Sequence, residues 1–166
     1  MRGQASALRP AVGHALLIFA VAVACGFVAN TVSPRRIPWS EDWGNYIESK
    51  ALREGVLLVT TSRAKELAAQ HACIILDARP AADYKAGRIP GAVSLPYDNV
   101  EEELAHVQVL LSPSQPIMTY CSGKQCDESF LLTLYLKKAG FTNIVLYAGG
   151  FDQWRAEGLP TEGGQP

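Results

Sequence analysis

Cys121 is the residue whose type and position best suit nucleophilic chemistry. It follows the apolar run IMTY and precedes a polar segment, SGKQCDES, after which a helical pattern begins. A loop that turns from a strand into a helix directs backbone N–H groups into one concavity, next to the positive end of the helix dipole. Such a site lowers the pKa of a thiol, and the thiolate is its reactive form. The pattern predicts a nucleophilic thiolate; the alternative is a small residue that closes a buried strand.

The residues after Cys121 are expected to form an anion-binding loop. Gly123 lets the chain bend, and Lys124 is the cation of the segment. The loop amides would hold the charge of a sulfur anion. The expected loop consists of Ser122, Gly123, Lys124, Gln125 and Cys126.

Cys126 offers a second thiol, five residues after the first. It could resolve a persulfide or a sulfenate at Cys121 by forming an internal disulfide. The alternative is a cysteine at a helix start with no redox part. The other cysteines, Cys25 and Cys73, complete no CxxC pair or other zinc-type spacing, so we expect no metal site and no cofactor.

Alternating strand and helix patterns from Val56 onward are expected to position the loop. A helix capped by Ser62 should follow the first strand, and Gly140 should end the helix after the loop. This order predicts an α/β fold with a mostly parallel sheet, in which ligands bind outside the carboxyl ends of the strands. The predicted strands are 57–60, 73–78, 92–96, 117–121 and 143–147.

The N-terminal segment 11–33 is mostly apolar, and no charged residue lies between Arg9 and Arg35. As a helix it would reach roughly 35 Å, enough to cross a hydrocarbon core of about 30 Å. The alternative is a cleaved signal ending at the A-x-A pattern before Cys25. We expect a single-pass anchor in a bacterial inner membrane. The basic residues on its two sides nearly balance, and we expect the domain that follows to be extracytoplasmic.

The chain is therefore expected to have four parts. A short helix before the domain would be capped by Ser40 and pack its Trp43, Ile47 and Ala51 face on the domain. The parts are a tail with the anchor (1–36), a juxtamembrane helix and linker (37–56), one domain (57–160) and a disordered tail (161–166).

Length and charge limit the classes of function. The 166 residues suffice for one real core but are few for two domains. The formal net charge of -1 gives no field for collecting phosphate backbones, so nucleic acid is not an expected partner.

Three segments resemble motifs of the rhodanese family, in the family's order. They are DARPAADYKAGRIPGAVSLPYD from Asp77, YCSGKQCDES from Tyr120 and AGGFDQW from Ala148. The resemblance implies a five-stranded parallel sheet flanked by helices. It also implies that Cys121 takes sulfur from a donor such as thiosulfate and passes it to a nucleophilic acceptor.

Three charged residues in the first of these segments are expected to support the site. Asp77 and Arg79, at the end of a strand, would brace the loop by ion pairing rather than react. Arg88 would hold a turn or face the donor.

The loop departs from the family pattern at its end. Similar enzymes carry an arginine where Cys126 stands, and Asp127 and Glu128 follow it here. The acidic end should weaken binding of a dianion such as thiosulfate, whose turnover is therefore in doubt. The loop is also longer than the usual rhodanese form, and in this it resembles the related phosphatase and arsenate-reductase branch. That chemistry needs an arginine to clamp the oxyanion, and the segment CSGKQCDES has none.

The sequence thus predicts a membrane-anchored sulfurtransferase that carries sulfane sulfur as a persulfide on Cys121. Its expected partners are a small sulfur-donor anion, such as thiosulfate or polysulfide, or a protein persulfide, and a thiol acceptor. The first alternative is a catalytically silent rhodanese-like binding module. The second is a thiol–disulfide redox protein that uses Cys121 and Cys126.

Overall fold

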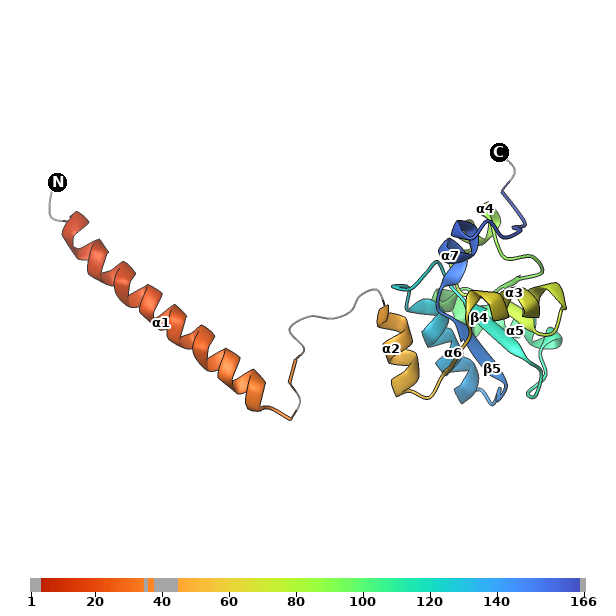
Figure 1. Ribbon diagram of the computed structural model, residues 1–166, viewed down its shortest axis with the longest axis horizontal. Coiled ribbons are helices and arrows are strands. Elements are labelled where there is room, and N and C mark those ends of the chain that lie inside the picture. The colour runs from red at the N-terminus through yellow and green to blue at the C-terminus, as the bar shows by residue number, and fades with distance from the viewer. Residues whose placement is uncertain (1–3, 35, 38–44, 165–166) are drawn as a thin grey trace. The chain divides into compact units, whose positions relative to one another are not determined.

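Five short parallel strands form one sheet in the order β1-β5-β4-β2-β3. The computed structural model describes residues 4–34, 36–37 and 45–164. Central β4 pairs along its whole length with β2 and with β5, so its carboxyl end lies in the middle of one sheet edge (Figure 1). This confirms the predicted α/β fold with a parallel sheet. The strands are β1 (Leu57–Leu58), β2 (Ile74–Asp77), β3 (Val93–Ser94), β4 (Ile117–Tyr120) and β5 (Ile144–Tyr147).

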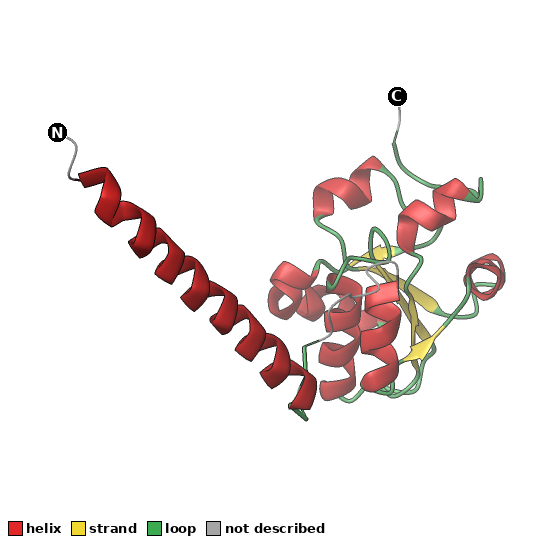
Figure 2. Cartoon of the chain, turned by 60° about the vertical axis from the view of Figure 1, so that its left-hand side comes forward, coloured by secondary structure: helices red, strands yellow, loops and turns green. Residues whose placement is uncertain are grey.

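Helices cover both faces of the sheet (Figure 2). One face packs against α3 (Thr61–Ala69), α4 (Ala81–Ala86) and α7 (Gly150–Ala156). The other packs against α2 (Tyr46–Arg53), α5 (Val100–Val107) and α6 (Glu128–Lys138). Two short 3₁₀ turns, η2 (Tyr97–Asn99) and η3 (Gln108–Leu110), flank α5.

Strand β4 carries no charged residue because helices cover both of its faces. Met118 and Tyr120 belong to the core on the α3 and α7 side, and Ile117 belongs to the core on the α5 and α6 side. Thr119 is also fully buried, and its hydroxyl is 2.6 Å from that of Thr133 in α6. A strand covered on both faces gives an unbroken apolar run rather than an alternating one.

Helix α2 belongs to the folded domain. Ile47 and Ala51 are buried and share a core cluster with Phe130 of α6 and Leu146 of β5. The chain divides into the compact units Met1–Glu41 and Asp42–Pro166, so α2 and the domain lie in one unit, and the predicted domain boundary at residue 57 stays a prediction. The expected cap Ser40 and the expected contact residue Trp43 lie outside the described residues.

Two local predictions differ from the structure. The hydroxyl of Thr60, not that of Ser62, caps α3 and accepts the N–H of Arg63 at 3.3 Å. Residues 161–164 of the expected disordered tail are ordered. Glu162 pairs with Arg88 as an antiparallel bridge, with N–O distances of 2.8 and 2.9 Å. Residues 165–166 lie outside the described part.

The N-terminal unit contains one long helix, α1 (Gln4–Val32). Its segment Val12–Val32 is long and apolar enough to cross a membrane, a property that a signal sequence would share. The side chain of Asn30, in the last turn of the helix, bonds the backbone of Ile37 beyond it. Nδ2 donates to the carbonyl at 2.8 Å, and Oδ1 accepts the N–H at 2.7 Å.

Candidate active site

Cys121 directly follows β4 and begins a loop that ends at the first residue of α6, Glu128. The carbonyls of Cys121 and Ser122 accept the N–H groups of Phe151 and Asp152, both at 2.8 Å, from the first turn of α7. In a trans peptide the carbonyl and the following N–H point in opposite directions. The N–H groups of Ser122 and Gly123 therefore point away from α7.

Gly150 permits this close approach. Its φ of +63° lies in the left-handed region, and a Cβ there would lie 2.6 Å from the carbonyl oxygens of both Cys121 and Ser122. Only a glycine fits both the conformation and the space. The AGGF segment thus holds the loop through its backbone.

The loop amides are largely unused within the protein. Among residues 45–164, the N–H groups of the four residues after Cys121 donate no hydrogen bond to another protein group. The N–H of Cys126 instead closes a turn on the carbonyl of Gly123 at 3.0 Å. Four amides rather than the expected five could therefore hold an anion; they belong to Ser122, Gly123, Lys124 and Gln125.

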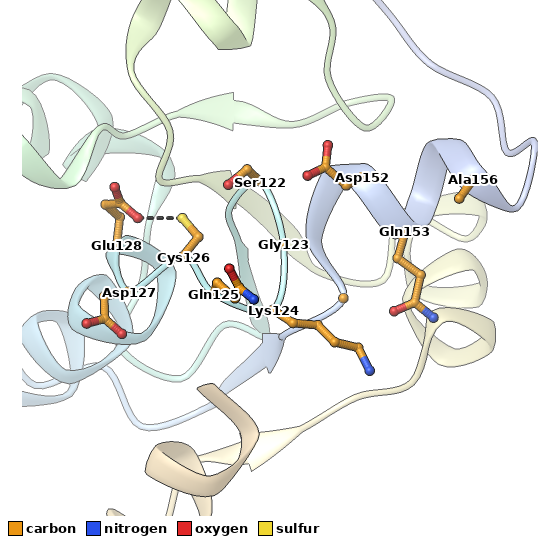
Figure 3. Close-up of a pocket in the computed structure, with 11 residues that line it drawn as sticks. Ser122, Gly123, Lys124, Gln125, Cys126, Asp127, Glu128, Asp152, Gln153 and Ala156 are labelled. Carbon is orange, nitrogen blue, oxygen red and sulfur yellow. Dashed lines mark hydrogen bonds between the residues drawn. The ribbon is translucent and has the colours of Figure 1, made fainter. Parts of the chain in front are cut away.

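The two loop cysteines meet. The Sγ atoms of Cys121 and Cys126 are bonded as a disulfide, and the Cα atoms are 6.2 Å apart, within the usual range. Oε2 of Glu128 lies 3.3 Å from Sγ of Cys121. The same oxygen contacts Sγ of Cys126 (Figure 3). In the reduced pair, either thiol could donate a hydrogen bond to this carboxylate.

An open cavity of about 1040 Å³ lies between the loop and α7 (Figure 3). Cys126 lines it, whereas Cys121 does not and is only 2% exposed. The charged side chains that line the cavity are three carboxylates and one lysine, and this balance disfavours binding of a dianion. The lining residues are Ser122, Gly123, Lys124, Gln125, Cys126, Asp127, Glu128, Gly149, Asp152, Gln153 and Ala156.

Helix α2 braces the loop from outside. Nζ of Lys50 donates to both carboxylate oxygens of Asp127, at 3.0 and 3.2 Å. Lys124 lies 3.7 Å from Glu48, and its carbonyl accepts the N–H of Ile47 at 3.4 Å. The cation of the loop is thus already paired with a carboxylate, which lowers its value for binding an anionic donor.

Asp77 and Arg79 form a buried network under the loop. Nη2 of Arg79 donates to Oδ2 of Asp77 at 2.6 Å and to the carbonyl of Gly87 at 2.7 Å. The hydroxyl of Tyr120, the residue before Cys121, donates to the same Oδ2 at 2.5 Å. Burial first, and then the charge of Asp77, raise the pKa of Tyr120 well above its usual value. The expected ion pair is therefore present, and its role in bracing the loop stays a prediction.

Arg88 is placed differently. Its Nε lies 3.5 Å from Glu162, and its guanidinium lies over the ring of Tyr84 at 4.7 Å. It does not line the cavity, so the structure favours the turn-holding alternative over contact with a donor. Cys73 also lies away from the loop, and burial raises the pKa of its thiol, consistent with an inert residue.

Three residues of the site were not foreseen from the sequence in these roles: Lys50, Glu128 and Gly150. Glu128 was recognised only as an acidic residue. Its position two residues after Cys126, at a helix start, was the available signal. Cys121, Cys126 and Glu128 also form a group whose ligand atoms lie within 4.8 Å of one another, which the linear spacing did not predict. Three donors fall short of the usual four of a structural zinc site, and two of them are bonded to each other here.

Comparisons with known proteins agree with this geometry. The family model of the rhodanese-like domain matches residues 60–157. The HTH-type transcriptional regulator Rv0324 of Mycobacterium tuberculosis is 32% identical over 92 residues, covering 55% of this chain and 38% of the relative. The adenylyltransferase and sulfurtransferase UBA4 of Meyerozyma guilliermondii is 31% identical over 88 residues, covering 51% of this chain and 20% of the relative. The chain thus spans well under half of the length of either relative.

Solved structures show the same fold. The Alr3790 protein from Anabaena is 28% identical, with a TM-score of 0.52 over 61% of this chain and 78% of that one. Thiosulfate sulfurtransferase from Pseudomonas aeruginosa is 23% identical, with a TM-score of 0.60 over 74% of this chain and 23% of that one. The parallel sheet, the cysteine loop after its central strand and the match over residues 60–157 lead to one conclusion: the chain belongs to the rhodanese-like domain family.

Proposed function

We propose that the chain is a sulfurtransferase that carries sulfane sulfur as a persulfide on Cys121. The observation that carries the proposal is the orientation of the loop: α7 holds the carbonyls of Cys121 and Ser122, and four amides remain for a sulfur anion. Membership of a family related to sulfurtransferases supports it.

In this mechanism the thiolate of reduced Cys121 attacks the outer sulfur of a donor. The donor's sulfur–sulfur bond breaks, and its remainder leaves with the electron pair. The loop amides stabilise the thiolate before the step and the persulfide anion after it. A thiol acceptor then attacks the terminal sulfur and restores the Cys121 thiolate.

The charges of the cavity favour one class of donor. Asp127, Glu128 and Asp152 line it, and Lys124 is paired with Glu48. A polysulfide or a protein-bound persulfide should therefore react better than the thiosulfate dianion.

The experiment uses the full chain in detergent, reduced and then freed of reductant. It is incubated with thiosulfate, a polysulfide or a mercaptosulfonate, with cyanide or dithiothreitol as acceptor. Sulfur transfer and a transient one-sulfur mass increase on Cys121 are expected for the wild type and for the matched control Cys73→Ser, but not for Cys121→Ser. Equal behaviour of the wild type and Cys121→Ser with every donor would contradict the proposal.

The second candidate is a catalytically silent binding module. The near-complete burial of Cys121 and the cysteine in place of the family's arginine favour it. Such a module would form no persulfide with any donor, so the same experiment decides between the two.

The proposed location is a membrane, with Val12–Val32 as a single-pass anchor and the domain on the extracytoplasmic side. Protease added to intact spheroplasts should digest the domain. A domain that survives would lie on the cytoplasmic side.

A further inference from the structure

Glu128 is the carboxylate next to both loop sulfurs. Its Oε2 lies 3.3 Å from Sγ of Cys121. It also contacts Sγ of Cys126 (Figure 3). Within the described part of the chain, no lysine, arginine or histidine forms an ion pair with Glu128. A half-buried carboxylate beside two thiols, without a cation to hold its charge, is suited to accept a proton from one of them.

The two cysteines differ in accessibility. Cys126 lines the cavity, and Cys121 is 2% exposed behind it. An external thiol that enters the cavity therefore reaches Cys126 first. In the proposed mechanism the amides after Cys121 hold its thiolate, and this would make it the better leaving group.

We propose that Glu128 is the proton-transfer group of a Cys121–Cys126 redox pair that releases the bound sulfane sulfur as hydrogen sulfide. This inference rests on the proposed function for the persulfide itself. It adds a reductive step to sulfur transfer, and it assigns a reaction to the disulfide.

The release step balances as follows. Glu128 takes the thiol proton of Cys126, and the resulting thiolate attacks Sγ of Cys121 in the persulfide. The bond between Sγ and the terminal sulfur breaks, and the terminal sulfur takes the proton from Glu128 and leaves with the electron pair as HS⁻. The sulfane sulfur gains two electrons, and the two cysteine sulfurs lose two as they form the disulfide.

An external dithiol closes the cycle. One of its thiolates attacks the accessible Sγ of Cys126, and Cys121 leaves as a thiolate. Its second thiol then displaces Cys126 from the mixed disulfide, so the dithiol is oxidised and the pair is reduced. Glu128 passes the proton of that second thiol to Cys126, which restores the starting state.

The first experiment separates this inference from the proposed function. The reduced full chain in detergent receives inorganic polysulfide without another thiol, and the mass of the loop peptide is measured. Wild type should form the internal disulfide, whereas Cys126→Ser should keep a stable Cys121 persulfide until dithiothreitol is added. A lasting persulfide in the wild type would overturn the reductive step alone. Neither product in either protein would overturn the proposed function as well.

The second experiment tests Glu128 without sulfur chemistry. Glutathione disulfide oxidises the reduced pair, and the rate of disulfide closure is followed against pH. Glu128→Gln should slow closure by about 10²-fold at neutral pH and approach the wild-type rate at alkaline pH, where the thiols ionise unaided. Glu128→Asp should restore part of the rate.

The matched control is Glu101→Gln, an exposed carboxylate in the first turn of α5. It should follow the wild-type rate at every pH, and circular dichroism checks that each variant is folded. Parallel pH profiles for Glu128→Gln and the wild type would overturn the role of Glu128.

Discussion

The carboxyl ends of β2 and β4 lie side by side, yet they treat their polar groups in opposite ways. At the end of β2, the buried carboxylate of Asp77 accepts hydrogen bonds from buried Arg79 and from buried Tyr120, the last residue of β4. After β4, four backbone amides donate no hydrogen bond to any other group within residues 45–164, and an accessible cysteine faces a cavity. The reactive loop thus lies beside a strand end whose buried polar side chains are hydrogen-bonded to one another. Asp77 and Arg79 neutralise each other at the end of β2, and the loop amides after β4 can hold an anion.

The largest effect should come from breaking the buried ion pair at the end of β2. Asp77→Ala leaves the guanidinium of Arg79, 5% exposed, without its carboxylate, and we expect a loss of about 3–5 kcal/mol in the free energy of unfolding. Urea denaturation of the full chain in detergent measures it.

The control is Glu66→Ala, which removes an exposed ion pair with Arg63. That change should cost no more than about 1 kcal/mol. Similar losses in the two variants would show that the buried network contributes no more than a surface pair.

The second largest effect should come from Gly150→Ala, which disturbs the loop after β4. A left-handed non-glycine residue costs about 1–3 kcal/mol, and the added Cβ must also displace the carbonyls of Cys121 and Ser122. A shift of the loop by about 1 Å would lower the rate of persulfide formation roughly 10²-fold.

Gly158→Ala provides the matched control. Gly158 has a similar φ of +66°, but a Cβ there meets nothing within 4 Å. It should lose comparable stability and keep the wild-type rate. An equal loss of rate in the two variants would show that backbone strain, rather than loop position, is responsible.

Tyr120→Phe should change how the stability of the domain depends on pH in the alkaline range. Burial and Asp77 raise the pKa of Tyr120, so the folded chain keeps the phenol proton above pH ~10, where the unfolded chain loses it. The wild type therefore loses stability as pH rises, by up to about 1.4 kcal/mol per pH unit for this group.

The variant lacks this alkaline slope. It should instead lose about 1.5–3 kcal/mol at neutral pH, because the hydrogen bond to the Asp77 carboxylate is gone. Denaturation curves between neutral and alkaline pH measure both effects. An unchanged slope would mean that Tyr120 ionises in the folded chain as in a free peptide.

The sequence was sufficient to predict the sheet and the place of Cys121. Strands covered on both faces leave apolar runs, and Gly140 marks the helix end with a φ of +98°. The orientation of the sulfurs was not predictable, because it depends on the turn that Cys126 closes on Gly123. The brace from Lys50 to Asp127 joins residues 77 apart, and no local pattern encodes such a contact.

The same limit applies to the helix cap and the tail. Adjacent hydroxyls at residues 60–62 offer equivalent signals, and only the path of the chain decides that Thr60 is the cap. The tail is polar and short, which predicts disorder. Its isolated bridge requires the loop segment that contains Arg88 to be brought near by the fold.

The smallest effect should come from Lys50→Met, which frees Asp127 beside the cavity. The ion pair is partly exposed and should contribute about 0.2–1 kcal/mol to stability, as should the exposed pair lost in the control Arg63→Met. Only Lys50→Met adds an unpaired negative charge next to Cys126, so it should slow persulfide formation from thiosulfate more than from a neutral organic polysulfide. High salt should reduce this difference, because it screens partly exposed charges. Equal slowing with both donors at every salt concentration would mean that Lys50 positions the loop mechanically and does not act through charge.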